Sequence, residues 1–115
     1  MTLVRGQLAA VDVAGTGTLT DVYTVPASKI ADVNINIANR TDSNTAVRLA
    51  VIKADVAANV ANEDYVIYGL ETDKLATHLA PITYTGVIMG AGDTVAVYSS
   101  ANAVSVQVNG IEEDV

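Results

Sequence analysis

A two-residue alternation of apolar and polar side chains between Asp21 and Ile52 is the feature that most constrains the fold. Side chains alternate between the two faces of a β-strand, so this period predicts strands with one buried face and one solvated face. In the first run Asn34 and Asn36 take the solvated face. The apolar positions are Val33, Ile35 and Ile37 in the first run and Val47, Leu49 and Val51 in the second.

The two runs are separated by the polar segment Asn39–Asn44, which contains Asn, Arg, Thr, Asp and Ser. Residues of this kind favour turns. The pattern therefore predicts that the two runs pair as the central antiparallel hairpin of an all-β domain. Arg48 and Ala50 are expected on the solvated face of the second strand.

Further short strands are expected along the rest of the chain, at spacings of about ten residues, which is typical of a sandwich or barrel. Gly86 is a candidate bulge, and Gly90–Asp93 is expected to form a tight turn. Between the strands, residues 53–64 are expected to form a loop with at most one helical turn, and Glu112–Asp114 an acidic tail. The expected strands are 19–25, 30–38, 45–52, 65–70, 82–89, 94–98 and a run through Val104, Val106 and Val108.

The predicted fold is a single antiparallel β-sandwich, jelly-roll-like, with about seven or eight strands. One domain spans residues 1–115, and residues 1–13 form either an extended N-terminal arm or the first strand. The chain has no Phe or Trp, so Val, Ala, Ile and Leu must fill the core. Such side chains suit two sheets packed about 10 Å apart. A core without large aromatic rings buries less area, so oligomerisation would add stability.

Composition argues against several classes of partner. The formal net charge is −7 and no basic patch is present, so nucleic-acid binding is not expected. No apolar run reaches the roughly 20 residues that a membrane helix needs, and the N-terminus does not resemble a signal peptide. The absence of Cys excludes disulfides and thiolate metal sites and is compatible with synthesis in a reducing host cytoplasm.

No catalytic motif stands out. His78 is the sole histidine, and no nucleophile motif surrounds any Ser, so His78 is interpreted as a surface or interface residue. Glu63, Asp64, Glu71 and Asp73 could in principle supply the paired carboxylates of a glycosidase or oxygen ligands for calcium. They lie among Asn and Thr, where solvated acids are normally found, and do not match the EF-hand spacing. We expect no catalytic residue, cofactor or metal site.

Two other short patterns have simple interpretations. Gly90–Asp93 lacks the lysine and the following helix of a phosphate-binding loop, so a β-turn is favoured. Asn39-Arg40-Thr41 matches the N-glycosylation pattern, but nothing in the sequence supports a secretory route.

Two blocks resemble small structural proteins of tailed-bacteriophage virions. They read DVYTVPASKIADVNINIANRT and GVIMGAGDTVAVYSSANAVSVQVNGIE, and they cover over a third of the chain. The similar features are the run Tyr23–Ala27, the pair Asn39 and Arg40, a Gly-Asp turn and the closing Gly-Ile-Glu. The resemblance implies a β-sandwich that decorates the capsid or belongs to the tail.

The favoured function is therefore a capsid decoration (cement) protein, not an enzyme, which binds the outer shell and stabilises it. The implied partners are the major capsid protein or other virion proteins, and a homo-oligomer, with a trimer favoured. Contacts beyond the sandwich are expected from residues 1–13, because an extended arm can pair with a neighbour's strand edge. The candidate interface residues are Leu3, Val4, Arg5 and Leu8.

The alternative is a tail or tail-fibre component that contacts other tail proteins or the host surface. A sugar-binding tip presents aromatic rings for stacking, and Tyr65, Tyr68, Tyr84 and Tyr98 are the candidates. A glycan hydrolase is the third hypothesis, with Glu63 and Glu71 as its test positions.

Overall fold

The computed structural model describes residues 3–13, 19–40, 45–72, 82–100 and 104–114, and for 69–72 the backbone alone. Within these ranges the chain forms eight strands and two short 3-10 turns, η1 and η2, and no α-helix. The elements are β1 Leu3–Val13, β2 Thr20–Thr24, β3 Lys29–Asn39, β4 Thr45–Ile52, η1 Ala57–Asn59, η2 Asn62–Asp64, β5 Tyr65–Thr72, β6 Ile82–Met89, β7 Thr94–Ser99 and β8 Val104–Asp114.

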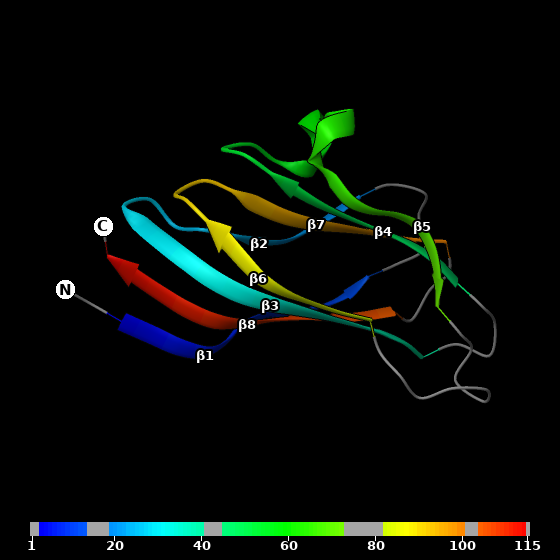
Figure 1. Cartoon of the computed structure of the whole chain (residues 1–115), viewed down its shortest axis with the longest axis horizontal. Helices are drawn as coiled ribbons and strands as arrows, with labels where there is room; N and C mark the ends of the chain where they lie inside the picture. Colours follow the sequence, from blue (N-terminus) through cyan, green and yellow to red (C-terminus); the bar gives the residue numbers. More distant parts are fainter. Residues whose placement is uncertain (1–2, 14–18, 41–44, 73–81, 101–103, 115) are drawn as a thin grey trace.

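The strands form two four-stranded antiparallel sheets that pack face to face. One sheet has the order β1-β8-β3-β6, and the other has the order β2-β7-β4-β5. Figure 1 shows the second sheet above the first, with β3 and β8 in the middle of the lower sheet. The predicted all-β sandwich is therefore confirmed.

The strand pairing follows a simple rule along the chain. The first strand pairs with the last, β2 with β7, β3 with β6, and β4 with β5, all antiparallel. These four nested pairs correspond to one long hairpin with its turn between β4 and β5. Rolling of this hairpin into a sandwich adds two further pairs, β3 with β8 and β4 with β7. This is the strand order of a jelly roll, so the jelly-roll-like prediction is also confirmed.

The predicted central hairpin is wrong. The strands β3 and β4 belong to different sheets, and neither pairs with the other. The apolar faces were predicted correctly, because Ile35 and Leu49 are both fully buried. They belong to one core cluster but face it from different sheets, instead of lying side by side in one sheet. Alternation specifies which face of a strand is buried, but it does not specify the neighbouring strand.

The core lies between the sheets and consists mainly of β-branched side chains, with Tyr23, Leu49 and Met89 as larger members. Valine contributes from both sheets, and no Phe or Trp is present in the chain. Close packing of these short side chains matches a thin two-layer sandwich. The largest fully buried side chains are Ile35, Ile37, Leu49, Ile52, Met89, Val13, Val25, Val33, Val47, Val95, Val97 and Val104.

The outer face of β4 is partly covered, which corrects the expectation for Ala50. Ala50 and Ala96 are fully buried in a second, small apolar cluster on the outer face of the β2-β7-β4-β5 sheet. Ala57 and Val60, from the segment that contains η1 and η2, pack against this cluster. The segment forms two 3-10 turns where at most one helical turn was expected.

The predicted acidic tail is also wrong, because β8 continues through Asp114. Its last residues pair with the start of β3, where Lys29 Nζ lies 2.6 Å from Asp114 Oδ1. The Tyr23 hydroxyl donates a hydrogen bond to Glu112. Tyr23 and Lys29 are far from Glu112 and Asp114 in the sequence. The run of acidic residues alone therefore predicted a solvated tail.

Three other local predictions agree with the structure, at residues 3–13, at Gly86 and at Gly90–Asp93. Residues 3–13 form a strand along β8 rather than a free arm, and Val13 is fully buried. Gly86 has φ +74° at a register shift between β3 and β6, and its N–H donates to Asn34 Oδ1 at 3.2 Å. The predicted bulge is therefore confirmed. A hydrogen bond of 3.1 Å from Asp93 N to Gly90 O closes the predicted tight turn.

Candidate functional site

A row of large side chains crosses the outer face of the β2-β7-β4-β5 sheet. Arg48 on the central strand β4 is in register with Tyr98 of β7 on one side and with Tyr68 of β5 on the other. Residues directly opposite each other on neighbouring strands have Cβ atoms about 5 Å apart. The register therefore holds the arginine between two tyrosines.

Both tyrosine rings contact the guanidinium group. The Arg48 Cζ atom lies 4.2 Å from the centroid of the Tyr68 ring and 4.5 Å from that of the Tyr98 ring. Both distances are within the range of cation–π attraction. Tyr65 meets Tyr68 edge to face, with ring centroids 5.0 Å apart. The Arg48 guanidinium group is thus held between aromatic rings.

The guanidinium group has no polar partner among the side chains that the structure describes. Arg48 Nε is buried and makes no hydrogen bond, and neither of the two ion pairs found in the described ranges involves Arg48. A buried donor without a partner is costly. Arg48 therefore keeps donor capacity that the described part of the protein does not use.

The row borders a groove of about 540 Å³, which we call the Arg48 groove. Small alanines at Ala50 and Ala96 leave room for the η1–η2 segment to fold down and form one wall. The Ala57 N–H donates to Asp21 Oδ1 at 2.8 Å, which ties this wall to β2. The groove is lined by Leu19, Asp21, Arg48, Ala57, Ala58, Val60, Tyr65 and Tyr98.

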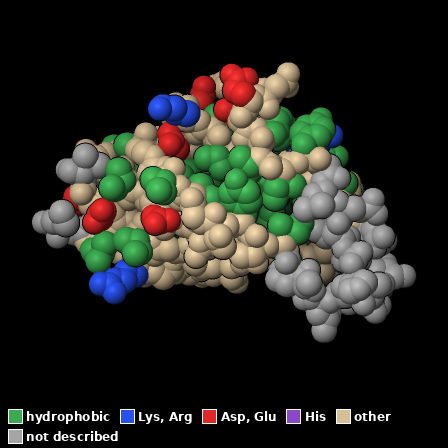
Figure 2. Space-filling model, in the orientation of Figure 1, with side chains coloured by type: hydrophobic (Ala, Val, Ile, Leu, Met, Phe, Trp, Pro, Cys, Tyr) green, Lys and Arg blue, Asp and Glu red, His purple; other side chains and the backbone are tan. Residues whose placement is uncertain are grey.

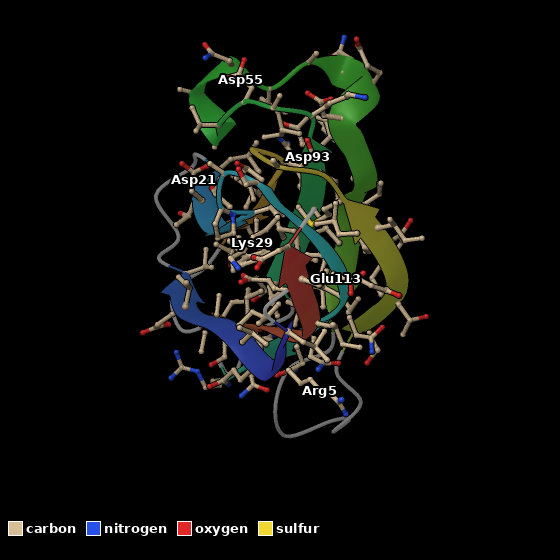
Figure 3. The ribbon with its side chains drawn as sticks, turned by 90° about the vertical axis from the view of Figure 1, so that its left-hand side faces the viewer. Arg5, Asp21, Lys29, Asp55, Asp93 and Glu113 are labelled. Carbon is tan, nitrogen blue, oxygen red and sulfur yellow. The ribbon has the colours of Figure 1, made fainter. Side chains whose placement is uncertain are left out.

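Asp55 stabilises the start of the η1 wall. Its Oδ1 accepts hydrogen bonds of 2.8 Å from Val56 N and from Asn59 Nδ2. These bonds, the one from Asn59 first, lower the pKa of Asp55 below its usual value. Figure 3 shows Asp55 in the segment after β4, with Asp21 below it. Both hydrogen-bond donors belong to the η1 wall, so Asp55 stabilises this wall.

The opposite sheet carries a second candidate surface, which we call the isoleucine patch: Leu3, Ile30, Asp32, Ile88, Ile111 and Glu113. These residues come from all four strands of the β1-β8-β3-β6 sheet and, with Ala31, line a hollow of about 350 Å³. Ile88 is 80% exposed, and Leu3, Ile30 and Ile111 are between 40% and 44% exposed. Exposed apolar side chains gathered in one place mark interaction surfaces.

Charged and apolar residues alternate across the isoleucine patch. One row of paired residues runs from Arg5 through Ile111 and Asp32 to Ile88. In the next row Glu113 lies between Leu3 and Ile30. Figure 2 shows this mixture of hydrophobic and acidic side chains near one end of the molecule, and Figure 3 shows Arg5 below Glu113.

The four sequence-derived interface residues all lie in β1, where Leu3 belongs to this patch and Arg5 is paired with Ile111 beside it. Leu3, Val4 and Arg5 are exposed, whereas Leu8 is half-buried and packs against the core. Leu3 and Arg5 therefore present side chains beside Ile111 and Glu113.

The candidate catalytic residues do not form a cluster in the described structure. Glu63 is exposed in η2, and Asp64 Oδ2 accepts a hydrogen bond of 2.8 Å from Ala61 N. His78, Asp73 and the side chain of Glu71 lie outside the described residues. No group of three or more His, Cys, Asp or Glu side chains that could hold a metal ion occurs in the described ranges.

The structure brings together three of the four candidate sugar-stacking tyrosines. Tyr68 and Tyr98 flank Arg48, and Tyr65 contacts Tyr68 and lines the same groove. Tyr84 lies on the other sheet and packs against the core. The importance of Arg48 was missed from the sequence. Its one signal was an isolated cation within an otherwise apolar strand, and its partners on β5 and β7 could be found only from strand pairing.

Comparison with known proteins does not assign this chain to a family. No protein-family model matches the sequence, and a search of curated proteins finds no match. No helix within the described residues has the length and apolar character to cross a membrane.

Proposed function

We propose that this chain is a structural protein of a tailed-bacteriophage virion, and that it serves as a capsid decoration protein. It binds the outside of the shell, bridges neighbouring capsid subunits and stabilises the shell, with no catalytic step. The resemblance of the two sequence blocks supports this assignment. The observation that carries it is the isoleucine patch, an exposed surface suited to contact with another protein.

The isoleucine patch has the composition of a specific contact. Ile88, Ile111 and Leu3 offer apolar area, and burial of such area contributes about 25 cal/mol per Å². Asp32 and Glu113, set between them, restrict the orientation of a partner and select one with complementary charge. Many weak contacts of this kind, one set per copy, would sum to a large stabilisation of the shell.

Assembly of the protein with itself is part of the proposal. The valine-rich core lacks large aromatic side chains and gains from additional burial, which favours oligomerisation. The trimer is what the resemblance to decoration proteins implies. The edge strands β1 and β6 of the patch-bearing sheet offer unpaired backbone groups to a neighbouring copy or to the capsid.

A binding assay with purified components tests the proposal. Capsids that lack this protein are incubated with the wild type or with the double variant Ile88→Ser and Ile111→Ser, and occupancy is measured after sedimentation. We expect the double variant to lose most of its occupancy. Glu63→Gln, on an exposed site in η2, serves as the matched control and should bind like the wild type. Equal occupancy of all three proteins would contradict the proposed role of the patch.

Point variants are preferable to removal of residues 1–13. Because β1 is paired along its length with β8 and buries Val13, its deletion would disturb the sandwich itself. A loss of occupancy would then not identify the contact.

The alternative function, a tail or tail-fibre component, is favoured by the Arg48 groove. An aromatic, partly polar groove is typical of a ligand site rather than of a shell contact. Immunogold labelling of intact virions separates the two functions. Label on the head supports the decoration role, and label confined to the tail supports the alternative.

A further inference from the structure

The Arg48 guanidinium lies between two tyrosine rings, and Arg48 lines the groove. Tyr68 and Tyr98 come from strands on opposite sides of β4, and their rings lie 4.2 and 4.5 Å from Arg48 Cζ. The two rings therefore flank the cation from opposite sides. Hydrogen bonds from a guanidinium group are made at its edge, where two parallel N–H groups match the two oxygens of a carboxylate.

No carboxylate among the described side chains fills this role. Asp21 is the one acid among the lining residues of the Arg48 groove, and its Oδ1 already accepts the Ala57 N–H. No ion pair joins Asp21 to Arg48 within the described residues. The arginine is thus pre-positioned and its charge is not paired there, which is a favourable state for binding an anion.

The other lining residues suit a ligand with both apolar and hydroxylated parts. Leu19 and Val60 give the groove apolar walls, and Tyr65 adds an aromatic one. The free oxygen of the Asp21 carboxylate can accept hydrogen bonds from hydroxyl groups. The volume of about 540 Å³ lies in the range of small-ligand sites, roughly 300–1,000 Å³.

From this arrangement we infer that the Arg48 groove binds a carboxylate-bearing sugar of an acidic polysaccharide. The sugar carboxylate binds the edge of Arg48, its hydroxyl groups donate to Asp21, and its apolar ring face packs against the tyrosines. The net charge of −7 opposes binding of long polyanions, so the probe is a short acidic oligosaccharide. This inference goes beyond the proposed shell-binding function and uses the opposite sheet, so it does not depend on the isoleucine patch.

Tyrosine fluorescence gives a direct readout of binding. The chain has five Tyr and no Trp; Tyr68 and Tyr98 flank Arg48, and Tyr65 lines the same groove. The full chain is titrated with trigalacturonate and with the neutral galactose trimer of the same linkage, which differs only in the carboxylates. We expect a saturable fluorescence change with the acidic trimer and binding at least tenfold weaker with the neutral one, because the charge-assisted hydrogen bonds are lost.

Three variants locate the site. Arg48→Gln and Tyr68→Ala should each weaken trigalacturonate binding by about tenfold or more. Tyr68 is 65% exposed, so its replacement is expected to leave the fold intact even if Arg48→Gln lowers stability. Ile88→Ser, on the opposite sheet, is the matched control and should bind like the wild type. Thermal unfolding of each variant verifies that the proteins are folded.

Several outcomes would overturn the inference. Equal binding of the acidic and neutral trimers would exclude the proposed role of the Arg48 edge. Unchanged trigalacturonate affinity in folded Tyr68→Ala would place the ligand elsewhere. A short peptide with a free carboxyl terminus that binds as tightly as trigalacturonate would show that the groove recognises a peptide end rather than a sugar.

Discussion

The Tyr23 hydroxyl donates a hydrogen bond to the Glu112 carboxylate, and this bond joins the two sheets. Tyr23 belongs to β2 and Glu112 to β8, which lie in different layers of the sandwich. Tyr23 is 8% exposed and packs in the core. The bond therefore adds a directional polar contact between layers whose described core is packed mainly with valine and isoleucine.

Removal of this bond should lower stability measurably. For Tyr23→Phe we expect a decrease of about 1–2 kcal/mol in the free energy of unfolding, since a hydrogen bond to a carboxylate is lost and the ring is kept. Tyr84→Phe is the control, because it also removes a tyrosine hydroxyl but not the bond to Glu112. It should change the free energy of unfolding by less than about 0.5 kcal/mol. Urea unfolding followed by circular dichroism gives both values, and equal stability of Tyr23→Phe and wild type would contradict the expectation.

The same residue should make the fold sensitive to alkaline pH. Burial, then the hydrogen bond and charge of Glu112, raise the pKa of Tyr23 above its ordinary value of 10.0. The folded state therefore keeps the phenolic proton at pH values where the unfolded state loses it. The resulting stability is fully present below about pH 10 and is lost as the pH rises above it. Urea midpoints measured on both sides of this pH should fall more steeply for wild type than for Tyr23→Phe. Parallel curves would contradict this assignment.

Gly110 should not tolerate any side chain. It pairs with Val33, and a Cβ atom at this position would lie 2.1 Å from the Asp32 carbonyl oxygen and 2.8 Å from the Val33 Cα. Both contacts are with backbone, which cannot move aside without breaking the β3–β8 ladder. We expect Gly110→Ala to lose about 3 kcal/mol or to fail to fold. At Gly90 a Cβ would meet only Asp93 Oδ2 at 3.8 Å, so Gly90→Ala, compared by thermal unfolding, should remain close to wild type.

Two apolar residues on opposite sheets should respond very differently to truncation. Leu49 is fully buried and Ile88 is 80% exposed. Leu49→Ala should lower the free energy of unfolding by about 2–5 kcal/mol, because it leaves a cavity in a tightly packed core. Ile88→Ala should change it by less than about 0.5 kcal/mol. Guanidinium unfolding curves test both, and a large loss for Ile88→Ala would show that this side chain supports the fold instead of a contact.

The sequence carried most of the information on strands and faces. The strand Thr45–Ile52 was predicted with its observed bounds, and Val33, Ile35 and Ile37 are buried as the alternation indicated. Each of these features depends on neighbours two residues apart. The two-residue alternation was therefore sufficient to predict the strand and its buried face.

Features that depend on partners distant in sequence were not predictable in the same way. The pairing of β3 with β8 could not be read from the alternation of either strand, because many strands share the same period. Likewise, Glu112 and Asp114 looked like a solvated tail until Tyr23 and Lys29 were found beside them. The candidate site shows the same limit: Tyr65, Tyr68 and Tyr98 were recognised as aromatic candidates, but the position of Tyr68 and Tyr98 on either side of Arg48 is a consequence of strand register.

The pairing of β1 with β8 has a consequence for how the protein is made. During synthesis β1 leaves the ribosome early, but its partner strand, which also lies beside β3, is completed only at Asp114. Until then β1 has no neighbour in its sheet, and β3 can pair only with β6. The β1-β8-β3-β6 sheet can thus close only after β8 has been made, which predicts slow folding, as is usual for topologies dominated by contacts distant in sequence. In the interval, the exposed edges of β1 and β3 can pair with other chains. The yield of folded protein should therefore fall as the local concentration of nascent chains rises.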